Sequence, residues 1–174
     1  MTLKQRYVLA MEWLYKICVW TSGVALLLIT LVIPYGVFMR YVVNSPSSWP
    51  EPLSVVMMVA FSFIGGAAVY RAGAHIAVRA VVDAVGPRTK LVFEWATEAC
   101  LVFFCVFMVW KGYELVVATM HQSIAEFPDL PVGVVYMPIP ICGALLLLFI
   151  VERIWCGEPP KTSYMYQDDP EALE

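Results

Sequence analysis

The chain has 174 residues, of which 61% are hydrophobic and 14% are charged, and its formal net charge is −3 at pH 7. Soluble globular domains carry about 25% charged residues, so this composition excludes an ordinary soluble domain and predicts an integral membrane protein. The net charge itself indicates little, because the charges are segregated along the chain.

Four apolar segments are long enough, or nearly so, to cross a bilayer as helices. A helix rises about 1.5 Å per residue and must cover a hydrocarbon core of about 30 Å with its backbone hydrogen bonds closed internally. We therefore expect an all-α integral membrane fold in a single domain, residues 1–156, with transmembrane helices over 17–39, 50–70, 92–118 and 133–153.

The first segment follows a basic leader that contains Lys4, Arg6 and Lys16, as a cleaved signal peptide would. We reject a signal peptide because the apolar run is longer than a signal core, no small-x-small cleavage site follows it, and it ends at Arg40. The segment is therefore expected to be a transmembrane helix.

A tight polar turn, residues 40–51, separates the first two apolar segments. Trp49, Pro50 and Glu51 open the second helix, where a proline without an N–H group and an acid near the positive helix end are both favoured. Ser48 and Glu51 also have the spacing of a capping box. These residues are thus explained by the start of a helix.

Farther along the second helix, Ser62, Gly65 and Gly66 form a flat surface of small residues. Such a surface lets the backbone of another helix approach closely. We expect it to be a helix-packing surface, and the sequence leaves open whether the partner helix belongs to this chain or to another subunit.

A short amphipathic helix is expected over 75–86. His75, Arg79 and Asp83 recur every four residues opposite a row of valines, which is typical of a helix lying in the membrane interface. Together with Arg71 at the end of the second span, His75 and Arg79 are expected to anchor the chain in this interface.

The third segment is longer than one bilayer crossing demands, so its helix must tilt or protrude. Its ionisable residues lie toward the two ends, with Glu94 and Glu98 at one and Lys111 and Glu114 at the other. We expect Lys111 to reach the headgroups or to pair with Glu114. A role of these residues in an ion pathway is the alternative.

The loop before the last segment, residues 121–131, contains Asp129 and two prolines but no Lys or Arg. Pro138 and Pro140 follow inside the apolar run, so the fourth helix either kinks or begins near Met137. The acidic tail, residues 157–174, is expected to be disordered and cytoplasmic.

The basic residues predict the orientation. Four spans put both termini on one side, and that side carries nine of the eleven Lys and Arg residues. The opposite side carries Arg40 alone, and Lys111 lies inside the third span. The positive-inside rule therefore places both termini in the cytoplasm.

No catalytic, cofactor or metal site is predicted. His75 and His121 fall on opposite membrane faces, the five cysteines form no Cys-x-x-Cys pair, and there is no phosphate-binding glycine loop. A DsbB-type thiol oxidase needs cysteine pairs in its outer loops, and a small multidrug exporter resembles a shorter chain with a glutamate in the first span. This chain has neither feature.

Several of these stretches together resemble the small, four-helix membrane subunit of tripartite ATP-independent periplasmic (TRAP) transporters, the DctQ-like family. The resemblance covers most of the chain. One departure is that the family often has two acids after the tryptophan, whereas Glu51 is followed here by Pro52. The matching residues are Phe38, Arg40, Tyr41, Trp49, Glu51 and residues 65–67, 71–76, 128–131 and 136–138.

The resemblance implies an accessory subunit in the bacterial inner membrane, without catalytic or ion-binding residues of its own. Its permanent partner would be a large membrane subunit that carries an organic acid and coupling sodium ions. Its transient partner would be a periplasmic substrate-binding protein, and no nucleic acid is expected. The two outer loops would help to form the docking face, with Arg40, Trp49, Glu51 and Asp129 as candidate contacts.

Two other functions stay open at this point. A membrane anchor of a redox complex would show a haem or quinone signal when purified. A self-sufficient small carrier would support uptake by this chain alone in proteoliposomes.

Overall fold

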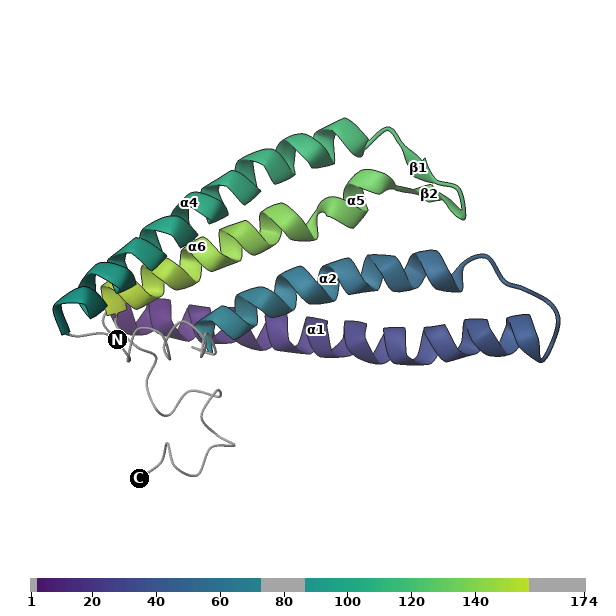
Figure 1. Cartoon of the computed structure of the whole chain (residues 1–174), viewed down its shortest axis with the longest axis horizontal. Coiled ribbons are helices and arrows are strands. Elements are labelled where there is room, and N and C mark those ends of the chain that lie inside the picture. The colour runs from purple at the N-terminus through teal and green to yellow at the C-terminus, as the bar shows by residue number, and fades with distance from the viewer. Residues whose placement is uncertain (1–2, 73–86, 157–174) are drawn as a thin grey trace, which may run out of the picture.

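The structure is a computed structural model that describes residues 3–72 and 87–156, with side chains described for residues 4–72 and 95–156. The elements are α1 (Leu3–Tyr41), α2 (Pro50–Arg71), α4 (Pro87–Thr119), β1 (Ser123–Ile124), β2 (Phe127–Pro131), α5 (Val132–Tyr136) and α6 (Pro138–Cys156) (Figure 1). The helix expected over 75–86, with His75 and Arg79, and the tail 157–174 lie outside the described residues.

Four helical stretches are long and apolar enough to cross a membrane, namely Lys4–Tyr41, Pro50–Arg71, Trp95–Thr119 and Val132–Cys156. This confirms the predicted all-α membrane fold. α1 has 39 residues and is therefore about 58 Å long, well beyond a hydrocarbon core of about 30 Å. It begins at Leu3, far before the span expected from residue 17, because no helix-breaking residue interrupts its basic leader.

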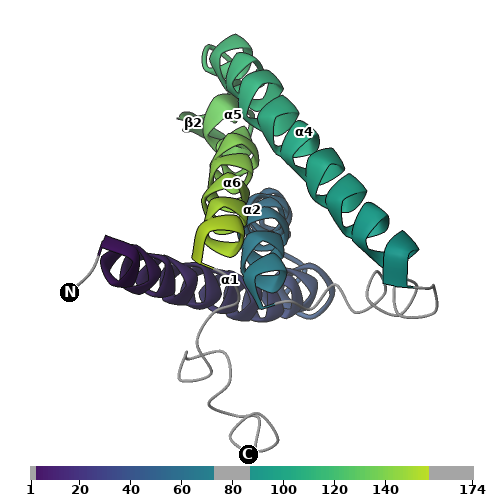
Figure 2. The ribbon, with the colours of Figure 1, turned by 90° about the vertical axis from the view of Figure 1, so that its left-hand side faces the viewer.

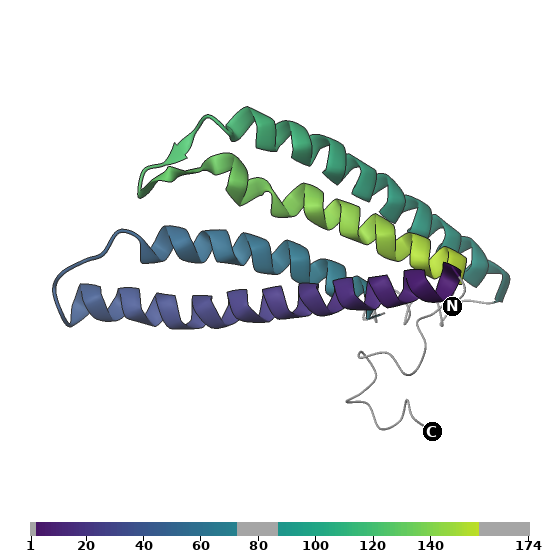
Figure 3. The same ribbon diagram turned by 180° about the vertical axis from the view of Figure 1, so that it is seen from behind.

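The helices form two antiparallel hairpins, α1 with α2 and α4 with α5 and α6. We call the end that holds Leu3, Arg71 and Cys156 the terminal end, and the opposite end, with both hairpin turns, the loop end. The hairpins converge at the terminal end, and their ribbons diverge toward the loop end (Figures 1 and 3). Seen from the terminal end, α2 and α6 lie between α1 and α4 (Figure 2).

Glycines allow α4 and α6 to approach closely. A Cβ atom added to Gly143 would lie 2.9 Å from Cγ2 of Val109 and 3.0 Å from the carbonyl oxygen of Cys105. A Cβ atom on Gly112 would lie 3.1 Å from the backbone nitrogen of Pro140. Since real side chains avoid such distances, these two glycines fix the separation of the two helices.

The last membrane segment is divided at its prolines. α5 ends at Tyr136, and α6 begins at Pro138, a residue that has no N–H group to continue the hydrogen-bond ladder. Of the two alternatives left by the sequence, a new helix rather than a kink is therefore what the structure shows.

The loop before α5 contains a small antiparallel sheet that the sequence analysis did not predict. Ser123 of β1 lies opposite Pro131 of β2, and Ile124 lies opposite Phe127. The N–H group of Val132 donates to the carbonyl oxygen of Gln122 at 2.8 Å, which closes the hairpin just before the helix begins. The loop is thus a folded hairpin whose two ends are held together.

Most of the apolar surface faces outward. In the most apolar part of each span only 17–33% of the residues are buried inside the chain. The buried core is correspondingly thin and includes small side chains such as Cys18, Ala67 and Cys105. The remaining apolar faces must be covered by lipid or by another protein, since water would be an unfavourable neighbour.

Candidate functional site

The most deeply buried charges lie at the terminal end, where α2 meets α6. Arg71 donates from Nε to Oε2 of Glu152 and from Nη2 to Oε1 of the same carboxylate, both at 2.8 Å. The two side chains are only 2% and 3% exposed. A bidentate arginine–carboxylate pair satisfies two charges that would each be costly to bury alone. The pair joins Arg71, the last residue of α2 in one hairpin, to α6 in the other hairpin.

Aromatic rings surround the guanidinium group of Arg71. Its central carbon lies 5.4 Å from the ring centroid of Tyr15 on α1 and 5.7 Å from that of Phe149 on α6. Both distances are within the range of cation–π attraction. Nη1 of Arg71 is buried and has no hydrogen-bond partner among the residues that the structure describes. Arg71, at the end of α2, is therefore held by two other helices at once, α1 and α6.

A second set of polar contacts brings α4 into the same region. The hydroxyl of Tyr70 donates to Oε2 of Glu98 at 3.1 Å, and Nη1 of Arg153 lies 3.1 Å from Oε1 of Glu98. We call Tyr70, Arg71, Glu98, Glu152 and Arg153 the terminal network. Its members come from α2, α4 and α6, so it ties the two hairpins together where they converge.

The start of α1 is fastened to the end of α6 as well. The hydroxyl of Tyr7 donates to the carbonyl oxygen of Leu148 at 3.1 Å, and Nζ of Lys4 donates to that of Trp155 at 3.3 Å. The rings of Tyr7 and Trp155 have centroids 6.0 Å apart. These contacts give the aromatic and basic leader a partner inside the chain.

The structure places the side chain of Arg71 in a different environment from the one expected from the sequence. The sequence suggested an anchor in the headgroup layer, whereas the side chain is buried against Glu152. Glu152 was not singled out, although it lies at the end of the fourth predicted span as Arg71 lies at the end of the second. This matching position was the one signal in the sequence that the two residues could form a pair. Opposite charges on the same membrane side of two spanning helices can meet only if the helices pack.

The predicted packing surface on α2 is divided between two directions. A Cβ atom on Gly65 would lie 3.2 Å from Oγ of Ser22, so Gly65 faces α1. A Cβ atom on Gly66 would have no heavy atom within 4 Å, and both Gly66 and Ser62 are exposed. Gly65 thus serves packing within the chain, and Ser62 and Gly66 face outward.

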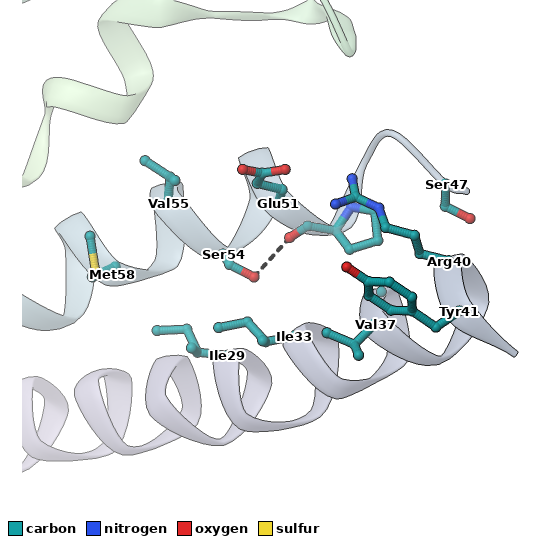
Figure 4. A pocket seen from close by; sticks show the side chains of 12 residues that line it. Ile29, Ile33, Val37, Arg40, Tyr41, Ser47, Glu51, Ser54, Val55 and Met58 are labelled. Atoms are coloured by element: carbon teal, nitrogen blue, oxygen red, sulfur yellow. Dashed lines mark hydrogen bonds between the residues drawn. The ribbon is translucent and has the colours of Figure 1, made fainter.

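Three of the four candidate docking residues lie close together at the loop end. Trp49 packs on Tyr35 with ring centroids 5.5 Å apart. Arg40 and Glu51 line one groove between α1 and α2 (Figure 4). Asp129 is exposed on β2 of the other hairpin.

The capping box expected at the start of α2 is absent. Trp49 occupies the N-cap position, and no side chain makes a capping hydrogen bond there. Pro52 is the third helical residue after Trp49, so the N–H group at the third position, which a capping side chain would satisfy, does not exist.

Lys111 and Glu114 pair with each other, as one of the sequence interpretations anticipated. Nζ of Lys111 lies 2.7 Å from Oε2 of Glu114, and 5.4 Å from the ring centroid of Trp110. Both charged side chains are about half exposed. Among the described residues no group of three or more His, Cys, Asp or Glu side chains could hold a metal ion. The side chain of Glu94 lies outside the described part.

Comparison with known proteins decides the family. The model of the family described as "Tripartite ATP-independent periplasmic transporters, DctQ component" matches residues 29–158. The chain belongs to this family. A protein of Haemophilus influenzae named "Putative TRAP transporter small permease protein" is 22% identical over 129 residues, which cover 74% of this chain and 80% of that protein.

Membership in the DctQ family makes the chain a transporter component and not an enzyme. It is a multi-pass protein of the bacterial inner membrane. The family implies a tripartite system that also has a large membrane subunit and a substrate-binding protein. In this DctQ-family protein the matched region contains the whole terminal network and both loop-end turns, whereas the first two thirds of α1, residues 3–28, precede it.

Proposed function

We propose that this DctQ-family chain binds and braces the large, sodium-coupled membrane subunit of a TRAP transporter for organic acids. The observation that carries the proposal is the terminal network, which ties the two hairpins into one unit while their outer faces stay apolar and exposed. A unit joined within itself can support a moving partner without rearranging. Its outward apolar surface offers contact area for that partner.

The contact with the large subunit includes Ser62 and Gly66. They are four residues apart on α2, both are exposed, and Gly66 has open space where a side chain would stand. Small residues at this spacing let a second helix backbone approach closely in a membrane. Because Gly65 already serves the contact with α1, the outward pair is free for another subunit.

The experiment replaces Gly66 with leucine and measures how much large subunit co-purifies with the tagged chain. Association should weaken by about 1–2 kcal/mol, which is roughly 5- to 30-fold, because leucine holds the helices apart. Gly23→Leu is the matched control, since a Cβ atom at Gly23 on α1 also meets nothing within 4 Å. Leucine favours a helix more than glycine does, so a loss at Gly66 alone cannot come from a weakened helix. Equal recovery with both variants would remove this contact from the proposal.

The terminal end faces the cytoplasm in this proposal, on the strength of the nine basic residues assigned to that side. Single cysteines at Lys4 and Ser45, in a variant without the native cysteines, test the orientation with an impermeant reagent added to intact cells. Labelling at Ser45→Cys only is expected. Labelling at Lys4→Cys only would reverse the orientation.

The loop end would then contribute to the docking face for the periplasmic substrate-binding protein. Arg40, Trp49, Glu51 and Asp129 lie at this end, and exposed charges can steer such an encounter. Asp129→Asn should raise the concentration of binding protein needed for half-maximal uptake. Asp129→Lys, which reverses the charge, should raise it further. An unchanged concentration dependence in an assembled Asp129→Lys complex would exclude Asp129 from the docking face.

A further inference from the structure

A groove of about 450 Å³ lies between α1 and α2 in the half of the hairpin nearest the loop end (Figure 4). This volume falls within the range of about 300–1,000 Å³ found for ligand sites. The groove is partly open to the outside, so a long flexible molecule can enter it.

The walls of the groove change from apolar to polar along its length. Ile29, Ile33 and Met58 line the deep part, and Arg40 and Glu51 lie at the loop end (Figure 4). Eleven residues separate Ile29 from Arg40 on one helix, which corresponds to about 16 Å, or roughly half of a 30 Å hydrocarbon core. With Arg40 at headgroup level, as expected for the end of the first span, the groove extends to about the middle of the membrane.

The one polar side chain in the middle of the groove is already satisfied. Oγ of Ser54 donates to the carbonyl oxygen of Pro50 at 2.7 Å, and Ser54 is buried. The hydroxyl therefore presents no unpaired donor to an apolar ligand. Below the mouth, the groove suits a hydrocarbon chain.

The mouth carries one positive and one negative side chain that are available to a ligand. Arg40 and Glu51 are both exposed, and within residues 3–72 and 87–156 neither forms an ion pair. A guanidinium group binds phosphate oxygens with two parallel hydrogen bonds, and a carboxylate accepts hydrogen bonds from an ammonium group. The two charges together match a phosphate linked to a primary amine.

We propose that the groove binds one molecule of a phospholipid with an ethanolamine headgroup. One acyl chain lies along Ile29, Ile33 and Met58, the phosphate accepts hydrogen bonds from Arg40, and the ammonium group donates to Glu51. A lipid fits better than a helix of the large subunit, because the groove covers one leaflet only, whereas a transmembrane helix would need a groove across the whole membrane. The proposal does not depend on the orientation of the chain or on the proposed function.

The test is native mass spectrometry of the full chain in detergent, with phosphatidylethanolamine or phosphatidylglycerol added. Phosphatidylethanolamine should bind to the native chain in a one-to-one ratio and in preference to phosphatidylglycerol. Arg40→Gln should weaken this binding about tenfold, because it removes a charge-assisted contact to phosphate. Ile33→Trp should abolish it by filling the groove, and since Ile33 is 49% exposed, this variant should still fold.

One control variant and one further test variant assign the effects to the groove. Lys111→Gln removes another exposed positive charge. Lys111 lies in the loop-end half of α4 and outside the groove, so this variant should leave lipid binding unchanged. Glu51→Gln should reduce the preference for phosphatidylethanolamine over phosphatidylglycerol while the acyl chain still binds.

Three results would overturn the proposal. Equal lipid binding by the native chain, Arg40→Gln and Ile33→Trp would mean that the lipid is only part of the general annulus. Preference of the native chain for phosphatidylglycerol would refute the ethanolamine headgroup. If Ile33→Trp prevented assembly with the large subunit and left lipid binding intact, the occupant of the groove would be a helix of that subunit.

Discussion

The two ends of the molecule use the same kinds of charged residue in opposite ways. At the terminal end, Arg71 and Glu152 are buried and paired across the two hairpins. At the loop end, Arg40 and Glu51 belong to one hairpin, are exposed, and make no ion pair within the described residues. Buried partners fix helices relative to one another, whereas exposed charges are available to headgroups or to other proteins.

The terminal end and the loop end therefore have different roles in the molecule. The hairpins are joined where the terminal network crosses between α2, α4 and α6. Toward the loop end each hairpin is held by its own turn and its own helix packing, and the ribbons of the two hairpins diverge. The terminal end should therefore determine the stability of the chain, and the loop end should determine what the chain contacts.

The largest expected effect comes from breaking the buried pair. Glu152→Gln leaves Arg71 buried without its counter-charge, which should cost about 3–5 kcal/mol of unfolding free energy. Thermal unfolding of the purified chain in detergent measures the loss. The double variant Arg71→Met/Glu152→Leu should recover most of it, because no charge then remains buried. A Glu152→Gln variant as stable as the native chain would show that the pair does not hold the hairpins together.

An intermediate effect should follow from separating α4 and α6. In Gly143→Leu even the Cβ atom would lie 2.9 Å from Val109, so the helices must move apart, at a cost of about 1–3 kcal/mol. Gly23→Leu, which adds the same side chain where the chain offers open space, should leave the melting temperature nearly unchanged. If Gly143→Leu and Gly23→Leu had the same melting temperature, the close approach of α4 and α6 would not contribute to stability.

The smallest effect should come from the partly exposed ion pair of the terminal network, between Glu98 and Arg153. Glu98→Gln removes the ion pair with Arg153, whose side chain is 48% exposed, but keeps an oxygen that can accept from Tyr70. Partly exposed pairs contribute about 0.2–1 kcal/mol and are weakened by salt. The difference in melting temperature from the native chain should shrink as salt is added, and Lys111→Gln should behave similarly because its pair is also exposed. A loss as large as that of Glu152→Gln would contradict the graded importance of burial.

Several features followed from the sequence by itself, because they depend on local properties. Long apolar runs must close their hydrogen bonds as helices in a membrane, so the four spanning helices could be predicted with their approximate positions. A proline removes one N–H group wherever it stands, so an interruption near Pro138 was foreseeable. The family was already apparent from the order of short motifs around the turn 40–51, and the comparison over residues 29–158 shows it.

Other features were decided only by the tertiary structure, because they depend on which helix faces meet. Arg71 could be an interfacial anchor or half of a buried pair, and only the packing of α2 against α6 brings Glu152 within 2.8 Å of it. Gly65 and Gly66 are adjacent in sequence, yet one faces Ser22 and the other faces outward, since neighbouring positions on a helix point about 100° apart. A single sequence contains the charges and the small residues of this protein, but the helix crossings determine which of them are partners.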